Sequence, residues 1–223
     1  GKMRAFVSRV VEPEEYATMT NEALFELIKQ EMWVDEGRVT GSFHHKKNAE
    51  FLERAIYVCP FCGLSTFESQ DDIITCKTCG RQIRHLPTKE LEGDFPYRFV
   101  ADWYDWQNAY ISSTDLSQLT DQPVYKETVQ LSKVHVYKYK ELLNKEATVR
   151  LYGDRITVDD RVFPFETLGA VVVLGKNKVN LYWDDEVLQL KGNQRFNALK
   201  YVNFFHKYKN TKSGDTHGKF LGL

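Results

Sequence analysis

Short apolar segments alternate with polar turns from about residue 130 onward. Seven segments have the period-two alternation and the β-branched and aromatic content that favour strands. They are residues 133–139, 147–153, 155–160, 161–165, 169–175, 178–183 and 186–192. The turns between them fall at 153–154, 159–160, 175–178 and 184–185. This pattern predicts a domain of about seven short strands.

The hydrophobic period changes after the last of these segments. Ala198, Val202 and Phe205 recur at helical spacing, and Asn193 is a candidate N-cap. Seven strands followed by one helix is the order of a pleckstrin-homology-like (PH-like) β-barrel, whose helix covers an open end of the barrel. We therefore expect a PH-like domain over residues 126–210 and a frayed tail over 211–223.

The start of the chain has a different pattern. Residues 1–38 predict a strand, a proline turn and a helix with Thr20 as a plausible N-cap. The apolar stripe of this helix is Leu24, Leu27, Ile28 and Met32. A stripe of this kind is more often part of a core than a partner site.

Seven aromatic side chains lie between residues 95 and 110, within a connecting segment over 94–125. In a helix, Trp103, Trp106 and Tyr110 would share one face. The favoured interpretation is a hydrophobic seam that packs one module against another. The alternative is a surface anchor at a membrane interface, where Trp and Tyr are common.

All four cysteines lie in the segment "YVCPFCGLSTFESQDDIITCKTCGRQIRHL", as two CxxC pairs thirteen residues apart. They are Cys59, Cys62, Cys76 and Cys79. Four thiolates complete the tetrahedral ligand set of a structural zinc site. The Gly that follows each pair fits a tight turn with positive φ. Two short strands around a polar turn at 70–72 predict a zinc ribbon, within a linker-and-ribbon region over 39–93.

Other uses of the cysteines fit the sequence less well. A rubredoxin-like iron centre also uses CPxCG turns, but its two pairs usually lie farther apart. A thioredoxin-type redox pair needs one CxxC at the start of a helix. A catalytic zinc keeps one ligand position open for water, and four thiolates leave none. We therefore expect structural Zn²⁺, in a chain of α+β class that is mostly β.

Composition and charge limit the classes of function that we expect for this protein. Thirty basic and thirty-one acidic residues leave a net charge of −1, which argues against a dedicated nucleic-acid binder. No apolar run approaches the length of a membrane span, and no signal peptide opens the chain, so we expect a cytoplasmic protein. The Gly-Lys-Met start is what an excised fragment would show.

The segment "GKMRAFVSRVVEPEEYATMTNEALFELIKQEMWVDEGR" resembles the end of the catalytic domain of bacterial 1-acyl-sn-glycerol-3-phosphate acyltransferases. In that family a final strand leads into "EP" and then into a helix of the "MTNEALFELI" kind. The continuation "NAEFLERAIYVCPFCG" resembles the extension of clostridial and related Firmicute members. The resemblance makes residues 1–38 a remnant of the catalytic domain and the rest an accessory region.

The catalytic motif of that family, HxxxxD, is absent. Its carboxylate orients a histidine that deprotonates the glycerol hydroxyl. The residues five positions after the six histidines are Ala49, Glu50, Glu90, Lys140, Thr211 and Gly222. His45 with Glu50 comes closest, but it lies in the linker beyond the catalytic region. No catalytic residue is therefore assigned, and this chain is expected to be inactive by itself.

The resemblance implies a non-catalytic accessory region of a phospholipid-biosynthesis acyltransferase. Its partners would be its own catalytic domain and an anionic membrane surface, with the protein peripheral to the inner face of the cell membrane. Lys176, Lys178 and Lys191 are the candidate lipid contacts, although charged hairpin turns are usually just solvated.

Three alternatives stay open. The region could be a protein-interaction module that uses residues 95–110. It could also bind nucleic acid through Arg81, Arg84 and His85, which the acidic hairpin "ESQDD" opposes. A whole enzyme of unknown type is disfavoured, because no catalytic constellation supports it.

Overall fold

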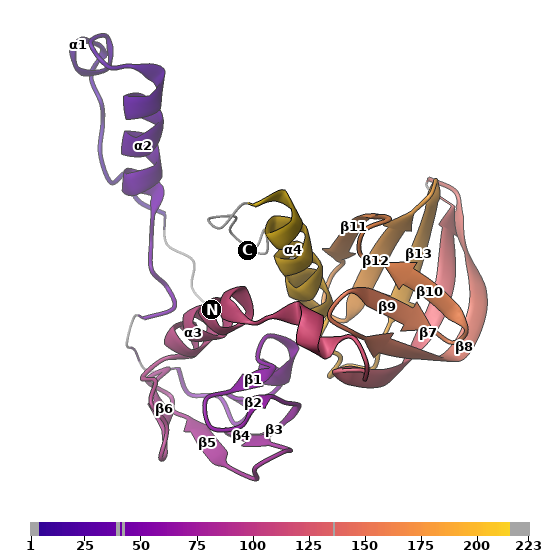
Figure 1. The fold of residues 1–223 in the computed structure, drawn as a ribbon. Helices are drawn as coiled ribbons and strands as arrows, with labels where there is room; N and C mark the ends of the chain where they lie inside the picture. Colours follow the sequence, from indigo (N-terminus) through magenta and orange to yellow (C-terminus); the bar gives the residue numbers. More distant parts are fainter. Residues whose placement is uncertain (1–4, 39–40, 42, 136, 215–223) are drawn as a thin grey trace. The chain divides into compact units, whose positions relative to one another are not determined.

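The protein is described here by a computed structural model covering residues 5–38, 41, 43–135 and 137–214 (Figure 1). Its internal contacts divide the chain into two units, residues 1–39 and residues 40–223. We describe each unit by itself.

The first unit contains two helices, α1 (Pro13–Tyr16) and α2 (Asn21–Met32). Thr20 is the N-cap of α2, as predicted, and its hydroxyl accepts a hydrogen bond from the Ala23 amide. The strand expected before α1 is not formed over the described residues 5–12, because a strand requires a partner strand to pair with. The core interpretation of the α2 stripe is wrong for this unit by itself, since no residue of α2 is buried.

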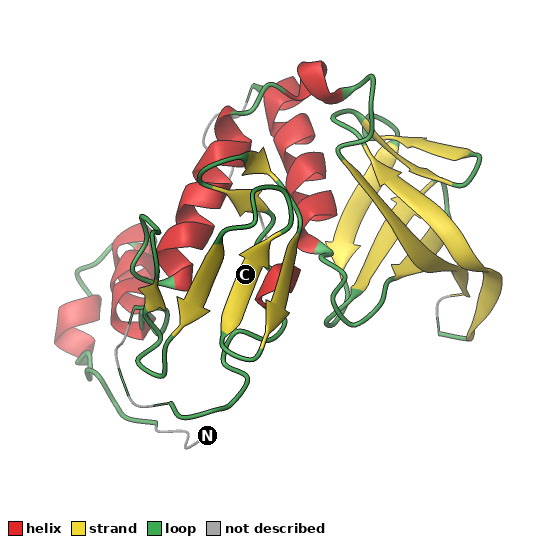
Figure 2. Ribbon diagram, turned by 90° about the horizontal axis from the view of Figure 1, so that it is seen from below, coloured by secondary structure: helices red, strands yellow, loops and turns green. Residues whose placement is uncertain are grey.

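The second unit is mostly β and contains a seven-stranded antiparallel sheet. Its strands are β7 (Tyr125–His135), β8 (Tyr139–Leu151), β9 (Arg155–Val158), β10 (Arg161–Pro164), β11 (Leu168–Val173), β12 (Lys178–Trp183) and β13 (Glu186–Lys191). The order β10-β9-β8-β7-β13-β12-β11 pairs the first strand with the last. The sheet curls into a nearly closed barrel (Figure 2), and β10 and β11 are its two edge strands. Six of the seven predicted strands are therefore confirmed, and the predicted strand 133–139 is wrong, because the turn between β7 and β8 lies within it.

The first strand of the barrel differs from the prediction. The sequence pattern begins the sheet at residue 133, but β7 starts eight residues earlier and turns into β8 just after His135. In β7, Val129 and Leu131 point into the core while polar residues face outward. Three successive polar residues at 126–128 interrupt the apolar alternation at the start of β7, which hides the strand signal there.

The barrel interior is filled by alternate residues of its strands. Fully buried members are Ala147, Val149, Leu151, Ile156, Val158, Phe163, Val179, Leu181, Leu188 and Leu190. Helix α4 (Leu199–Ser213) packs against β11. Ala198, Val202 and Phe205 are all buried, which confirms the predicted apolar face.

The predicted N-cap of α4 is wrong. Asn193 accepts a hydrogen bond from the Arg195 amide and so closes a turn before the helix. Asn197 is the residue that satisfies a first-turn amide, because its Oδ1 accepts from the Lys200 amide. The helix ends at Gly214, whose φ of 72° suits a glycine in the left-handed conformation.

The cysteine segment forms small sheets. Strands β1 (Val58–Cys59) and β2 (Gly63–Leu64) form a two-stranded sheet. Strands β3 (Phe67–Gln70), β4 (Ile73–Cys76), β5 (Gln82–His85) and β6 (Leu91–Glu92) form a four-stranded sheet in that order. The predicted hairpin is confirmed as β3–β4, with Asp71 at φ 55° in its turn. Strands β5 and β6 were not predicted.

Helix α3 (Val100–Ser113) is the hydrophobic seam that the aromatic pattern predicts. Trp103 is fully buried in the cluster beneath the four-stranded sheet, while Ile111 is fully buried in the barrel cluster. Trp106 packs against both clusters. The shorter 3₁₀ helices η1 (Leu52–Arg54) and η2 (Leu116–Leu119) lie in the connections around them.

Gln107 of α3 connects these parts through hydrogen bonds and has no exposed surface. Its Oε1 accepts from the amides of Tyr57 and Val58, at 2.7 and 3.1 Å. Its Nε2 donates to the Ala55 carbonyl at 3.0 Å. One side chain thus pairs with three backbone groups, two of which belong to the buried residues Tyr57 and Val58.

We predict that Gln107→Ala lowers the free energy of unfolding by about 2–4 kcal/mol, because buried amides left unpaired each cost about 1–3 kcal/mol. Denaturant unfolding measures the change. Gln118→Ala, at an exposed glutamine in η2, is the matched control and should shift it by less than about 0.5 kcal/mol. Equal shifts for the two variants would contradict the role of Gln107.

Candidate metal centre and basic face

Two tight turns present the four cysteines. In the first, Cys59 and Gly63 are cross-strand partners in the β1–β2 hairpin, and Gly63 has φ 79°. In the second, the Gly80 amide donates to the Cys76 carbonyl, and Gly80 has φ 75°. These positive φ values confirm why each CxxC pair is followed by glycine. A Cβ at position 80 would meet no atom within 4 Å, so backbone conformation alone favours glycine there.

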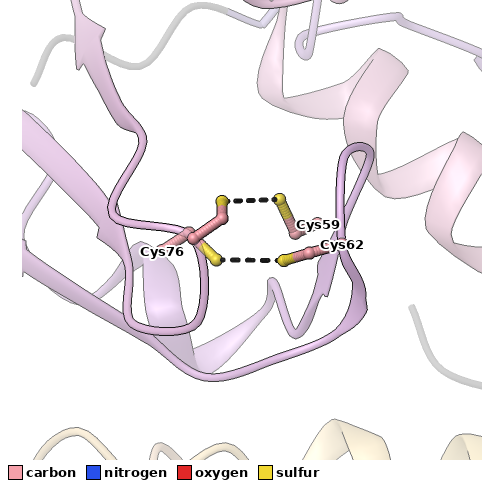
Figure 3. A group of neighbouring side chains, drawn as sticks. Cys59, Cys62 and Cys76 are labelled. Carbon is pink, nitrogen blue, oxygen red and sulfur yellow. Dashed lines mark hydrogen bonds between the residues drawn. The ribbon is translucent and has the colours of Figure 1, made fainter.

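The four sulfur atoms converge on one point. All four Sγ atoms lie within 4.8 Å of one another. The Cys59–Cys79 distance is 3.8 Å and the Cys62–Cys76 distance is 3.6 Å (Figure 3). A tetrahedral ion with metal–sulfur bonds of about 2.3 Å would hold its sulfurs about 3.8 Å apart. The arrangement is therefore compatible with one metal ion held by four thiolates.

The surroundings of Cys76 favour its thiolate form. Burial raises the pKa of the Cys76 thiol, but the Ser65 hydroxyl at 3.1 Å and two backbone amides of the second turn outweigh it and bring the pKa to about 7. The thiolate is the form that binds a metal. Ser65 is held in turn by the Thr78 hydroxyl at 2.7 Å, a contact that the sequence did not indicate.

The histidines do not add to this centre. The cysteine group is the only cluster of metal-ligating side chains among the residues that the structure describes. The Nδ1 atom of His45 accepts from the Lys47 amide and so closes a local turn. Burial lowers the pKa of His85, whose side chain lies in β5.

The two arginines that were candidates for binding nucleic acid form ion pairs with carboxylates. Arg81 contacts Asp94 at 2.6 Å, and Arg84 lies between Asp72 and Glu92. Arginines neutralised in this way are less available to phosphate groups.

The three candidate lipid contacts separate into two places. Lys178 of β12 and Lys191 of β13 are direct cross-strand partners on the outer face of the barrel. With Lys140 of β8 they line a polar cavity of about 200 Å³. Lys176 lies in the turn after β11 and lines a different cavity, along α4. Lys140 was missed in the sequence, because only the fold brings β8 near β13, on the other side of β7.

Comparisons with known proteins give little further information. No family model and no curated protein matches the chain. It is similar to a solved structure described as the N-terminal PH domain of the human ARAP2 protein, with 12% identity and a TM-score of 0.33. The match covers 44% of this chain and 90% of that chain. No helix in the described ranges is long and apolar enough to cross a membrane.

We predict that metal removal destabilises the second unit. Cys76→Ser, or chelation of the wild type, should lower the free energy of unfolding by more than about 4 kcal/mol, because the ion crosslinks both turns. Thermal unfolding with and without chelator measures this, and elemental analysis of the purified chain identifies the ion. Thr75→Ser, one residue away in β4, is the matched control. If the unfolding temperature of the wild type is the same with and without chelator, a structural metal is ruled out.

Proposed function

We propose that this chain is a non-catalytic accessory region of a phospholipid-biosynthesis acyltransferase, and that it places the enzyme at the membrane. In this proposal the cysteine segment is a zinc ribbon, and residues 125–213 form a PH-like domain. Support for the PH-like assignment comes from the strand order, with seven antiparallel strands closed by one C-terminal helix.

The metal of the proposal is structural zinc. Four thiolates are the ligand set of structural zinc sites, and they leave no position for a substrate or a reactive water. Cys59 and Cys76 are buried, whereas Cys62 and Cys79 are exposed, so the centre lies at the surface of the segment. The ion would therefore hold the two turns together and take no part in a reaction.

The observation that carries the membrane role is the pair Lys178 and Lys191. Two lysines directly opposite each other repel, and neither forms an ion pair with a carboxylate of the described residues. An anionic surface would compensate both charges at once. The inner leaflet of a bacterial membrane is such a surface, so we place the protein at its cytoplasmic face.

The first unit supports attachment to a further domain. Phe25, Ile28 and Met32 of α2 are 63%, 46% and 77% exposed, and Trp33 is 75% exposed. Apolar side chains gathered on one short helix are unfavourable in water and gain from a partner. In this proposal the partner is the catalytic domain to which residues 1–38 would belong.

A second candidate function is protein interaction, and the edge strand β11 favours it. The Leu174 amide bonds to the Lys178 carbonyl, so the alternation of the ladder points the backbone groups of Val171 and Val173 away from β12. A mainly apolar cavity of about 760 Å³ runs along β11 and α4. An extended peptide could add to this edge as a strand. The aromatic segment is a poorer contact than we expected, because Trp103 is buried.

The membrane role predicts binding to anionic vesicles. The chain should float with vesicles of phosphatidylcholine and phosphatidylglycerol but not with phosphatidylcholine alone, and high salt should weaken the binding because it screens exposed charges. Flotation at low and high salt measures this. Failure to bind either kind of vesicle would refute the membrane role and favour the protein-interaction candidate.

The accessory role predicts that this chain does not catalyse acyl transfer. Incubation with lysophosphatidic acid and either acyl-CoA or acyl-carrier protein should form no phosphatidic acid above the background without protein. The reason is that none of the six histidines has an aspartate five residues after it. Turnover by the purified chain that scales with its concentration would refute the non-catalytic assignment.

A further inference from the structure

The cavity on the outer face of the barrel contains an unusual set of side chains. Lys140, Lys178 and Lys191 surround it, with Gln130, Ser132 and Gln189 also among the lining residues. We call this site the lysine pocket. Its lining includes no acidic side chain. At about 200 Å³ it is smaller than the pockets that hold drug-sized ligands, and it suits an oxyanion with its nearest substituent.

Some cations of the same sheet form ion pairs with carboxylates, whereas those of the pocket do not. Lys133 pairs with Glu186, and Arg155 with Asp154 at 2.7 Å. Within the described ranges, no carboxylate forms an ion pair with any of the three pocket lysines. Three cations around one small cavity thus make a local excess of positive charge in a chain whose net charge is −1.

The register places two of these charges as close together as a sheet allows. The Gly192 amide bonds to the Asn177 carbonyl, so the next pair along, Lys178 and Lys191, is a non-hydrogen-bonded pair. In such pairs the Cα atoms are about 4.5 Å apart and the side chains lie closer than in hydrogen-bonded pairs. Like charges in this position destabilise the free protein, and an anion bound between them would remove the repulsion.

The pocket has a polar floor that positions the third lysine. Gln189 is only 4% exposed although it faces outward, and its Nε2 donates to Asn180 Oδ1 at 2.9 Å. Its Oε1 accepts from Lys140 Nζ at 2.8 Å, which draws that ammonium group over the cavity. Ser132 is among the lining residues, and a serine hydroxyl is a further possible donor for an oxyanion.

The β7–β8 hairpin next to the pocket carries exposed apolar and aromatic side chains. Strands β7 and β8 are the two longest of the sheet (Figure 1), and exposed apolar and aromatic side chains gather where they meet. Tyr137 is fully exposed and Tyr139 is 60% exposed, while Leu142 and Leu143 are 44% and 37% exposed. Tyrosine is at home at the interface between lipid head groups and acyl chains.

From these observations we infer that the lysine pocket binds the phosphate group of an anionic lipid while the end of the β7–β8 hairpin rests in the interfacial layer. This inference rests on the proposed membrane role and goes further, because it assigns the contact to one pocket and one chemical group. It adds Lys140 and Ser132 to the lipid contacts and leaves Lys176 outside them. A lipid head group and inorganic phosphate both present a phosphate oxyanion to the pocket. The exposed tyrosines and leucines of the hairpin favour the lipid as the ligand.

The test compares pocket and control variants of the full 223-residue chain on phosphatidylcholine vesicles that contain phosphatidic acid. Lys140→Gln, Lys178→Gln and Lys191→Gln should each weaken binding about fivefold, the value expected for one lysine at an anionic surface. Lys176→Gln and Lys126→Gln remove exposed lysines outside the pocket and should weaken it less than twofold. Equal losses in all five variants would overturn the pocket but leave the membrane role standing. No binding by the wild type would overturn both.

Two further measurements separate a built site from general attraction. Without lipid, Lys191→Gln should raise the melting temperature, because the repulsion with Lys178 is removed. A lower melting temperature would show that Lys191 stabilises the fold, and would contradict the repulsion. Tyr137→Ser should weaken vesicle binding but leave unchanged any amide shifts that inorganic phosphate produces at Ser132 and Gln189. Inorganic phosphate that displaces the wild type from vesicles, together with a Tyr137→Ser variant that binds vesicles normally, would overturn the lipid as the source of the anion.

Discussion

The backbone of Tyr57 and Val58 is buried, so each of its polar groups needs a partner inside the protein. Both amides donate to the side chain of Gln107. The Tyr57 carbonyl accepts from the Tyr125 hydroxyl of β7 and from the Ser65 amide, and the Val58 carbonyl accepts from Trp103 Nε1. Two residues therefore join the cysteine segment, helix α3 and the barrel, and the rest of the second unit depends on their position.

This constraint gives the proposed metal a role beyond its own ligands. Cys59 directly follows Val58, so an ion that fixes the first turn also fixes the segment on which α3 and β7 are anchored. A four-stranded sheet with strands of two to four residues has little core of its own, and the proposed tetrathiolate ion would compensate for that. Further contacts support the same junction. Asn197 donates to the Glu53 carbonyl, and Asn203 donates to the Tyr57 hydroxyl at 2.7 Å.

The outer face of the barrel follows a different logic. The interior of the barrel is packed with buried apolar side chains, which stabilise the fold. The lysine pocket instead retains charges that repel each other in the free protein. Sites that bind ligands often carry such a cost, because the interaction that destabilises the free state is the one that the ligand relieves. The same reasoning applies to the exposed residues of α2, which are unfavourable in water and favourable against another domain.

The local features of this protein were readable in the sequence. Turn glycines, a Thr N-cap, the alternation of six barrel strands and two CxxC pairs each depend on residues close together in the chain, so their patterns predicted them. The start of β7, the true first-turn partner of α4 at Asn197, the strands β5 and β6, and the grouping of Lys140 with Lys178 and Lys191 did not follow from the pattern. The start of β7 and the grouping of the lysines depend on residues far apart in the chain, which only the closed sheet and its register bring into contact. Asn197 accepts from an amide only three residues away, but its side chain is held in place by the distant Glu53 carbonyl.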